Sequence, residues 1–226
     1  MKKILFNEIF PPKIINGEKT MTRRIIKPQP TTVLYGTPVK SHDNQIGIKD
    51  IMPRYKVGEV VYIAEPYKLI DIFNWYYAIF SNVRGKEFEI NLREHKIWSE
   101  IGDYIIKRFD EQCKSKTGYC NKLFTPEFLA DLFIEITDVR AERLQKISDE
   151  DCIKEGIKEL NAGEIIRGYS NYIQYSSDNG VTCYDTPRAA FAALIDKING
   201  RGTWESNPYV WVYTFKFLKD YKNHGN

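Results

Sequence analysis

The chain has 226 residues, and its 33 Lys and Arg against 30 Asp and Glu leave a formal net charge of only +3, too small to indicate a nucleic-acid-binding protein by itself. A hydrophobic share of 42%, with fifteen Tyr and twelve Phe, excludes a disordered chain and favours β structure around a sizeable core. Since no apolar run approaches the about 20 residues that cross a bilayer, we expect a cytoplasmic protein without a membrane partner.

The first half of the chain predicts short strands, one short helix and one long loop. Pro11 and Pro12 suit the first turn of a helix over residues 11–16, and Gly17 suits its left-handed end. Residues 27–56 hold four prolines and are expected to form a long irregular excursion. Strands are expected at residues 3–6, 20–26, 60–65, 75–80 and 86–92.

The second half predicts longer elements. Apolar spacing favours a helix over residues 99–114, and Ser148 and Thr186 are typical first residues of two further helices, ended by Gly156 and Gly200. Strands are expected at residues 132–144 and 209–218. Strands with short helices between them favour an α+β fold, here a single domain over 1–226 on a small closed barrel of about five to seven strands, with insertions at about 27–56 and 81–121.

Cysteines and histidines do not indicate a metal site. The four cysteines include no C-x-x-C pair and the three histidines lie far apart, so we expect no metal and no cofactor.

The charge is unevenly distributed. Residues 1–27 carry seven Lys and Arg against two Glu, a net +5, so the remaining residues sum to −2. A local basic patch suits an anionic ligand such as a nucleotide or RNA, while a solvated basic end is the plainer interpretation.

Within this basic end, Gly17–Arg24 concentrates reactive side chains in the sequence G-E-K-T-M-T-R-R. In a regular strand Lys19 and Thr22 would face opposite sides, but a turn continuing through Lys19 would let it fold back toward Thr22. Such a cluster suits binding of phosphate or carbonyl oxygens, or activation of a hydroxyl. The alternative is a surface strand with solvated charges.

Four segments in order resemble one family. Gly17–Arg24 resembles the G-x-K-T-x-T-x-R signature of the ASCH superfamily, whose members have a PUA-like β-barrel. Residues 55–65, 136–156 and 198–212 resemble segments of a phage and prophage branch of that superfamily. The chain departs from the branch where arginines are expected, and the departures are Ala64, Glu127 and Asp131. These losses count against tight binding of a long polyanion.

The resemblance includes enzymes among its implications. Small bacterial members include amidohydrolases that remove the acetyl group of N4-acetylcytidine with a Lys–Thr–Glu set, and the matching positions here would be Lys19, Thr22 and Glu65. As a base, Lys19 needs its pKa lowered by about 3 units, which burial and nearby cations favour. Glu65 would orient the ammonium, or simply pair with an arginine. The expected substrate-binding residues are Thr20, Arg23, Arg24 and Tyr67.

Several functions stay open on these residues. Tyr67 suits stacking on a base, although a core aromatic is the plainer interpretation. The expected partner is a modified nucleoside or short single-stranded RNA, in the cytoplasm of a bacterial host if the protein is phage-encoded. The alternatives are a non-catalytic module that recognises RNA or a modified base, an RNA-cleaving enzyme, and a phage accessory protein without a ligand.

Overall fold

A computed structural model describes residues 1–7, 9–34, 37–41, 48–72, 75–80, 88–92, 98–114, 116, 118–161, 173–219 and 221. The chain divides into two compact units. The first comprises Met1–Pro12, Val60–Ile134 and Leu218–Asn226, and the second comprises Lys13–Glu59 and Glu135–Phe217. The single domain expected over 1–226 stays a prediction.

The largest sheet has five strands in the order β1-β6-β10-β13-β2. In the first unit β1 (Lys2–Leu5) runs parallel to β6 (Val60–Ala64). In the second, β13 (Tyr209–Phe217) is antiparallel to β2 (Met21–Ile25), and β10 (Phe133–Arg143) begins in the first unit and continues in the second. The α+β class is confirmed. Among the described strands no sheet closes on itself, so the small barrel stays a prediction.

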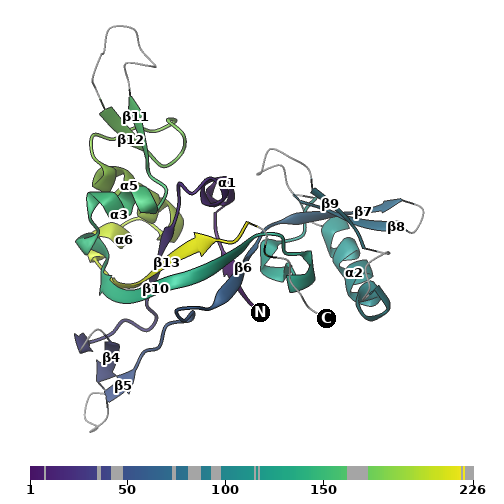
Figure 1. Cartoon of the computed structure of the whole chain (residues 1–226), viewed down its shortest axis with the longest axis horizontal. Coiled ribbons are helices and arrows are strands. Elements are labelled where there is room, and N and C mark those ends of the chain that lie inside the picture. Colours follow the sequence, from purple (N-terminus) through teal and green to yellow (C-terminus); the bar gives the residue numbers. More distant parts are fainter. Residues whose placement is uncertain are drawn as a thin grey trace. The chain divides into compact units, whose positions relative to one another are not determined.

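The first unit also holds a three-stranded antiparallel sheet, β7 (Tyr67–Ile72), β8 (Trp75–Phe80) and β9 (Phe88–Asn91). Helix α2 (Trp98–Cys113) lies beside this sheet, as Figure 1 shows. Two short 3-10 turns follow, at Lys122–Phe124 and Glu127–Leu129. A buried cluster joins the sheet to the helix and consists of Tyr67, Leu69, Ala78, Leu92, Ile105, Cys120 and Leu129.

In the second unit three helices gather near β10 and β13 (Figure 1): α3 (Asp149–Lys154), α5 (Pro187–Asn199) and α6 (Thr203–Ser206). The sequence predicted the starts of two of them. The hydroxyl of Ser148 accepts from the Asp151 backbone N–H, and that of Thr186 accepts from Ala189, with Pro187 in the first turn. A hairpin, β11 (Lys158–Asn161) and β12 (Ile173–Ser176), was not predicted.

The expected irregular excursion at 27–56 is instead partly ordered into a small antiparallel sheet. Its strands are β3 (Thr32–Leu34), β4 (Thr37–Ser41) and β5 (Ile48–Asp50). Three of the four prolines lie outside the strands, and the fourth, Pro38, lies in β4. In the region 81–121, residues 81–87 and 93–97 lie outside the described part of the chain. No helix of the described residues is long and apolar enough to cross a membrane.

Candidate functional site

The segment Gly17–Arg24 begins in the turn after α1 (Phe10–Ile15) and runs into β2. Gly17 takes a φ of +76°, and the Lys19 N–H donates to the Lys13 carbonyl, which turns the chain back before the strand begins. Along β2 successive side chains alternate. Thr22 and Arg24 therefore share one face of the sheet, and Arg23 lies on the other.

Lys19 is buried at this turn, with 2% of its surface exposed. Its Nζ donates to both the backbone carbonyl (2.6 Å) and the carboxylate Oε2 (2.7 Å) of Glu155. Burial lowers the pKa of the Lys19 amine, and Arg24 and Arg23 lower it further, while Glu155 acts in the opposite direction. Lys19 is therefore an amine that releases its proton more easily than a lysine in water.

The end of α3 explains why the amine sits there. The last carbonyls of a helix have no partner inside the helix and attract cations. Gly156, with a φ of +95°, turns the chain after α3. Lys19 then donates to the Glu155 carbonyl, and the buried Lys13 donates to the carbonyls of Gly156 (2.7 Å) and Ser177 (3.1 Å). Two buried lysines thus donate to carbonyls of the residues that directly follow this helix.

The backbone of Gly156 offers a test of this arrangement. Gly156→Ala should lower the free energy of unfolding by about 1–2 kcal/mol, because an L side chain is disfavoured at positive φ. The added Cβ would meet the stems of Lys13 and Lys19 at 3.4–3.5 Å, which is ordinary contact. Gly200→Ala is the matched control, since Gly200 has a φ of +105° with nothing within 4 Å of a Cβ. Urea unfolding should show similar losses of unfolding free energy for Gly156→Ala and Gly200→Ala. A loss several-fold larger for Gly156→Ala would contradict the ordinary contact expected between the added Cβ and the lysine stems.

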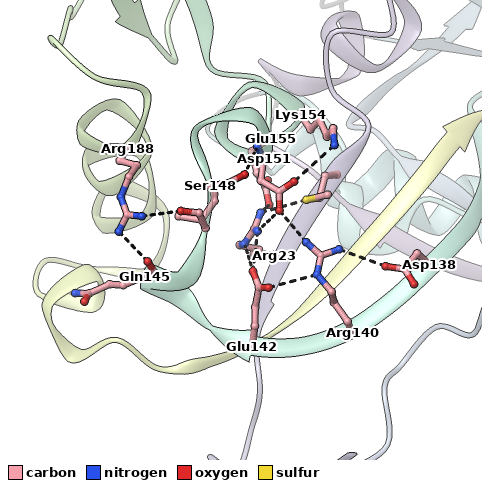
Figure 2. Close-up of polar contacts among 12 residues, drawn as sticks. Arg23, Asp138, Arg140, Glu142, Gln145, Ser148, Asp151, Lys154, Glu155 and Arg188 are labelled. Atoms are coloured by element: carbon pink, nitrogen blue, oxygen red, sulfur yellow. Dashed lines mark hydrogen bonds and ion pairs between the residues drawn. The ribbon is translucent and has the colours of Figure 1, made fainter. Parts of the chain in front are cut away.

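Arg23 lies at the centre of a group of three carboxylates (Figure 2). Its Nη2 donates to Glu142 Oε1 (2.7 Å) and Asp151 Oδ2 (2.8 Å), its Nε to Glu142 Oε1 (3.2 Å) and its Nη1 to Glu155 Oε1 (3.2 Å). Burial opposes the charge, but these carboxylates outweigh it and raise the pKa of Arg23. We call Arg23, Glu142, Asp151 and Glu155 the Arg23 cluster.

Arg140 borders the Arg23 cluster on its solvent side. It donates to Asp151 Oδ2 (2.7 Å), Glu142 Oε2 (3.3 Å) and Asp138 Oδ2 (3.3 Å), as drawn in Figure 2. The nitrogens of Arg23 all bond to protein groups, so the cluster holds β2 against β10 and α3 within the second unit. The substrate-binding role expected for Arg23 stays a prediction.

The other face of β2 meets aromatic side chains. Arg24 and Thr22 lie opposite Trp211 and Tyr213 in the register of β13. The Tyr213 ring packs edge-on against Tyr55 at 5.2 Å between centroids, and its hydroxyl accepts from the Arg54 backbone N–H (3.1 Å). A pocket of about 290 Å³ opens nearby, lined by Ile51, Met52, Pro53, Tyr55, Lys56, Val57, Val139 and Trp211. This pocket is apolar and aromatic, with a lysine at its wall.

Two predicted site residues belong to the first unit. Glu65 is buried directly after β6, and its backbone carbonyl accepts from the Thr125 hydroxyl (2.6 Å). Tyr67 has no exposed surface and packs in the core cluster between β7 and α2, which raises the pKa of its hydroxyl through burial. Lys19 and Thr22 belong to the second unit. The meeting of Lys19, Thr22 and Glu65, and the stacking role of Tyr67, stay predictions.

The basic end of the sequence does not form one exposed patch. Of the seven Lys and Arg in residues 1–27, three are buried against protein acceptors, namely Lys13, Lys19 and Arg23. Thr20 contributes through its backbone, with its N–H donating to Lys154 and its carbonyl accepting from Phe215. The net charge of residues 1–27 therefore overstates the number of positive charges in this region that a polyanion can contact.

Sequence reasoning missed the partners of the cations. The sequence analysis did not identify Glu142, Asp151 and Glu155 as partners of the cations. The acidic stretch from Asp149 to Glu155 and Glu142 in β10 were the signals that could have indicated them. In the described ranges no three His, Cys, Asp or Glu side chains are grouped so as to hold a metal ion.

Comparison with known proteins gives no further guidance. No protein-family model matches the chain, and neither the curated proteins nor the solved structures include a significant match.

Proposed function

We propose that this protein is an amidohydrolase that removes an acyl group from a modified nucleoside such as N4-acetylcytidine, on a PUA-like barrel, with Lys19, Thr22 and Glu65 as its catalytic residues. The observation that carries the proposal is the state of Lys19. Its amine is buried, oriented by two hydrogen bonds to Glu155, and has a lowered pKa. A buried amine of this kind is suited to accept a proton at a working pH nearer neutral.

The chemistry needs one proton acceptor and one nucleophile. The neutral amine of Lys19 would take a proton from the Thr22 hydroxyl, which attacks the acyl carbon, or from a water that Thr22 holds. The C–N bond then breaks, the nucleoside leaves with a proton on its amino group, and the acyl group leaves as the carboxylate after hydrolysis. Glu65 would orient the ammonium, and Arg24 would donate to the acyl oxygen through its planar guanidinium.

The direct test is release of cytidine from N4-acetylcytidine by the purified full chain, followed chromatographically. We expect turnover by the wild-type chain and none by Lys19→Met, which keeps an unbranched stem of similar length and removes the amine. Cytidine release equal to that of Lys19→Met at high enzyme concentration would discard this substrate. The same result with other acylated nucleosides would discard the amidohydrolase.

A second candidate function is recognition of a modified base or short single-stranded RNA without catalysis. The pocket beside Tyr55 and Trp211 favours it, because aromatic walls and a lysine suit a planar base and its phosphate. Three of the seven Lys and Arg in residues 1–27 are buried, so we expect binding of RNA to be weak and salt-sensitive. Saturable binding of the acetylated nucleoside without turnover would support this candidate over the enzyme.

A further inference from the structure

Glu155 divides its carboxylate between two buried cations. Oε2 accepts from Lys19 Nζ at 2.7 Å, and Oε1 accepts from Arg23 Nη1 at 3.2 Å. The backbone carbonyl of the same residue accepts from Lys19 at 2.6 Å. Side-chain exposures are 2% for Lys19, 5% for Glu155 and 1% for Arg23, so these charges meet away from water.

We propose that Glu155 is the positioning residue of Lys19: its carboxylate, divided between Lys19 and Arg23, orients the amine and holds the ammonium form that proton transfer produces. The inference rests on the proposed function only in taking Lys19 as the base of the reaction. Glu155 itself acts through Lys19 and has no contact with substrate in this scheme.

The orientation follows from the two acceptors on one residue. An ammonium on a four-carbon stem rotates freely unless its hydrogens are held. Two of the three Lys19 hydrogens go to the carbonyl and the carboxylate of Glu155, and both acceptors are fixed at the turn where α3 ends. The stem itself lies against Gly156, where an added Cβ would be 3.5 Å from two of its carbons. The residue that follows α3 thus supplies two acceptors that orient the amine.

The division of the carboxylate explains how Lys19 can lose its proton. A buried carboxylate without a partner is costly. If the Glu155 carboxylate were paired with Lys19 alone, deprotonation of Lys19 would leave it unpaired and would therefore be resisted. Here Arg23 keeps its bond to Oε1 whatever the state of Lys19, and a guanidinium stays charged. The charged groups that act on Lys19 in the second unit include Glu155, Arg23 and Arg24, and the two arginines disfavour a second cation beside them. Lys19 can therefore exchange one proton without leaving Glu155 unpaired.

The test compares two single substitutions that each remove one carboxylate from Arg23. Glu155→Gln also removes the negative charge at Lys19, whereas Glu142→Gln leaves the Lys19 contacts intact. We would follow the lysine side-chain NMR signals with pH, assigning Lys19 by its loss in Lys19→Met. Glu155→Gln should lower the Lys19 titration midpoint by about 1–3 pH units, since an opposite charge at this distance favours the charged form. Glu142→Gln should leave the midpoint within a few tenths of a unit.

The rate of deacylation should change in parallel. In Glu155→Gln the inflection of the pH–rate profile should move down with the Lys19 midpoint, and kcat should fall because the amine loses its orientation. Glu155→Asp retains the charge, so its pH–rate inflection and its kcat should both lie closer to the wild-type values. Where Glu155→Gln folds poorly, the same measurements are made on Glu155→Asp. An unchanged midpoint in Glu155→Gln, or an equal shift in Glu142→Gln, would overturn the inference.

The titration needs no substrate, so failure of the inference is separable from failure of the proposed function. A shifted Lys19 midpoint in a protein that cleaves no acylated nucleoside would leave the placement of Lys19 by Glu155 standing and remove the amidohydrolase. If Glu155→Gln turned over N4-acetylcytidine with the wild-type pH–rate profile, the amidohydrolase would stand and the positioning role of Glu155 would be removed.

Discussion

Replacing Arg23 with methionine should lower the free energy of unfolding by about 3–5 kcal/mol, the range found when one partner of a buried ion pair is removed. Three carboxylates meet this guanidinium, on Glu142, Asp151 and Glu155, and its side chain is only 1% exposed. Methionine fills most of the same volume, so the loss would report the stranded charges rather than a cavity. Arg23→Lys should recover part of the loss, because an ammonium cannot span all three partners.

Arg140 provides a matched control. It is the same residue type and bonds two of the same carboxylates, on Glu142 and Asp151, but its side chain is 39% exposed. Arg140→Met should therefore cost about 0–1 kcal/mol, as exposed ion pairs do. Urea unfolding of both variants at neutral pH gives the comparison. Equal losses would show that burial does not set the strength of the Arg23 cluster.

The second large effect concerns the hydroxyl of Thr22. Under the proposed mechanism Thr22→Val should reduce kcat/KM for N4-acetylcytidine by at least about 100-fold, comparable to the loss of a general acid or base. Thr22→Ser keeps the hydroxyl and should retain part of the activity. Valine suits the strand β2 and has the shape of threonine, so folding should survive.

The control for Thr22 is Thr214→Val in the neighbouring strand. Thr214 pairs with Met21 in the register of β13 and β2, one residue from the Tyr213–Thr22 pair, and so lies on the opposite face. Its substitution should leave kcat/KM within a few-fold of the wild-type value. Full activity in Thr22→Val would remove Thr22 from the mechanism, and equal losses in both variants would point to a general disturbance of the sheet.

The sequence by itself determined the elements whose signals are local. Thr186-Pro187 and Gly200 bracket α5 because a hydroxyl cap, a proline in the first turn and a glycine at positive φ each act within a few residues. The alternation from Tyr209 onward likewise specified β13, and the strand expected at residues 75–80 is β8. The same kind of signal missed the hairpin of β11 and β12 and the small sheet of residues 32–50. Short strands draw their stability from the partner strand rather than from their own sequence.

Only the tertiary structure decided what surrounds the cations of Gly17–Arg24. The basic charge of the N-terminal residues predicted an exposed patch, yet Lys13, Lys19 and Arg23 are buried against acceptors in α3 and in the two residues after it, more than a hundred residues away in sequence. An ion pair of that span leaves no periodic pattern along the chain, because charge attracts through space and the fold alone brings the partners together. Glu155 therefore became visible as the partner of Lys19 only in the folded chain, where Lys19 Nζ donates to both its carbonyl and its carboxylate.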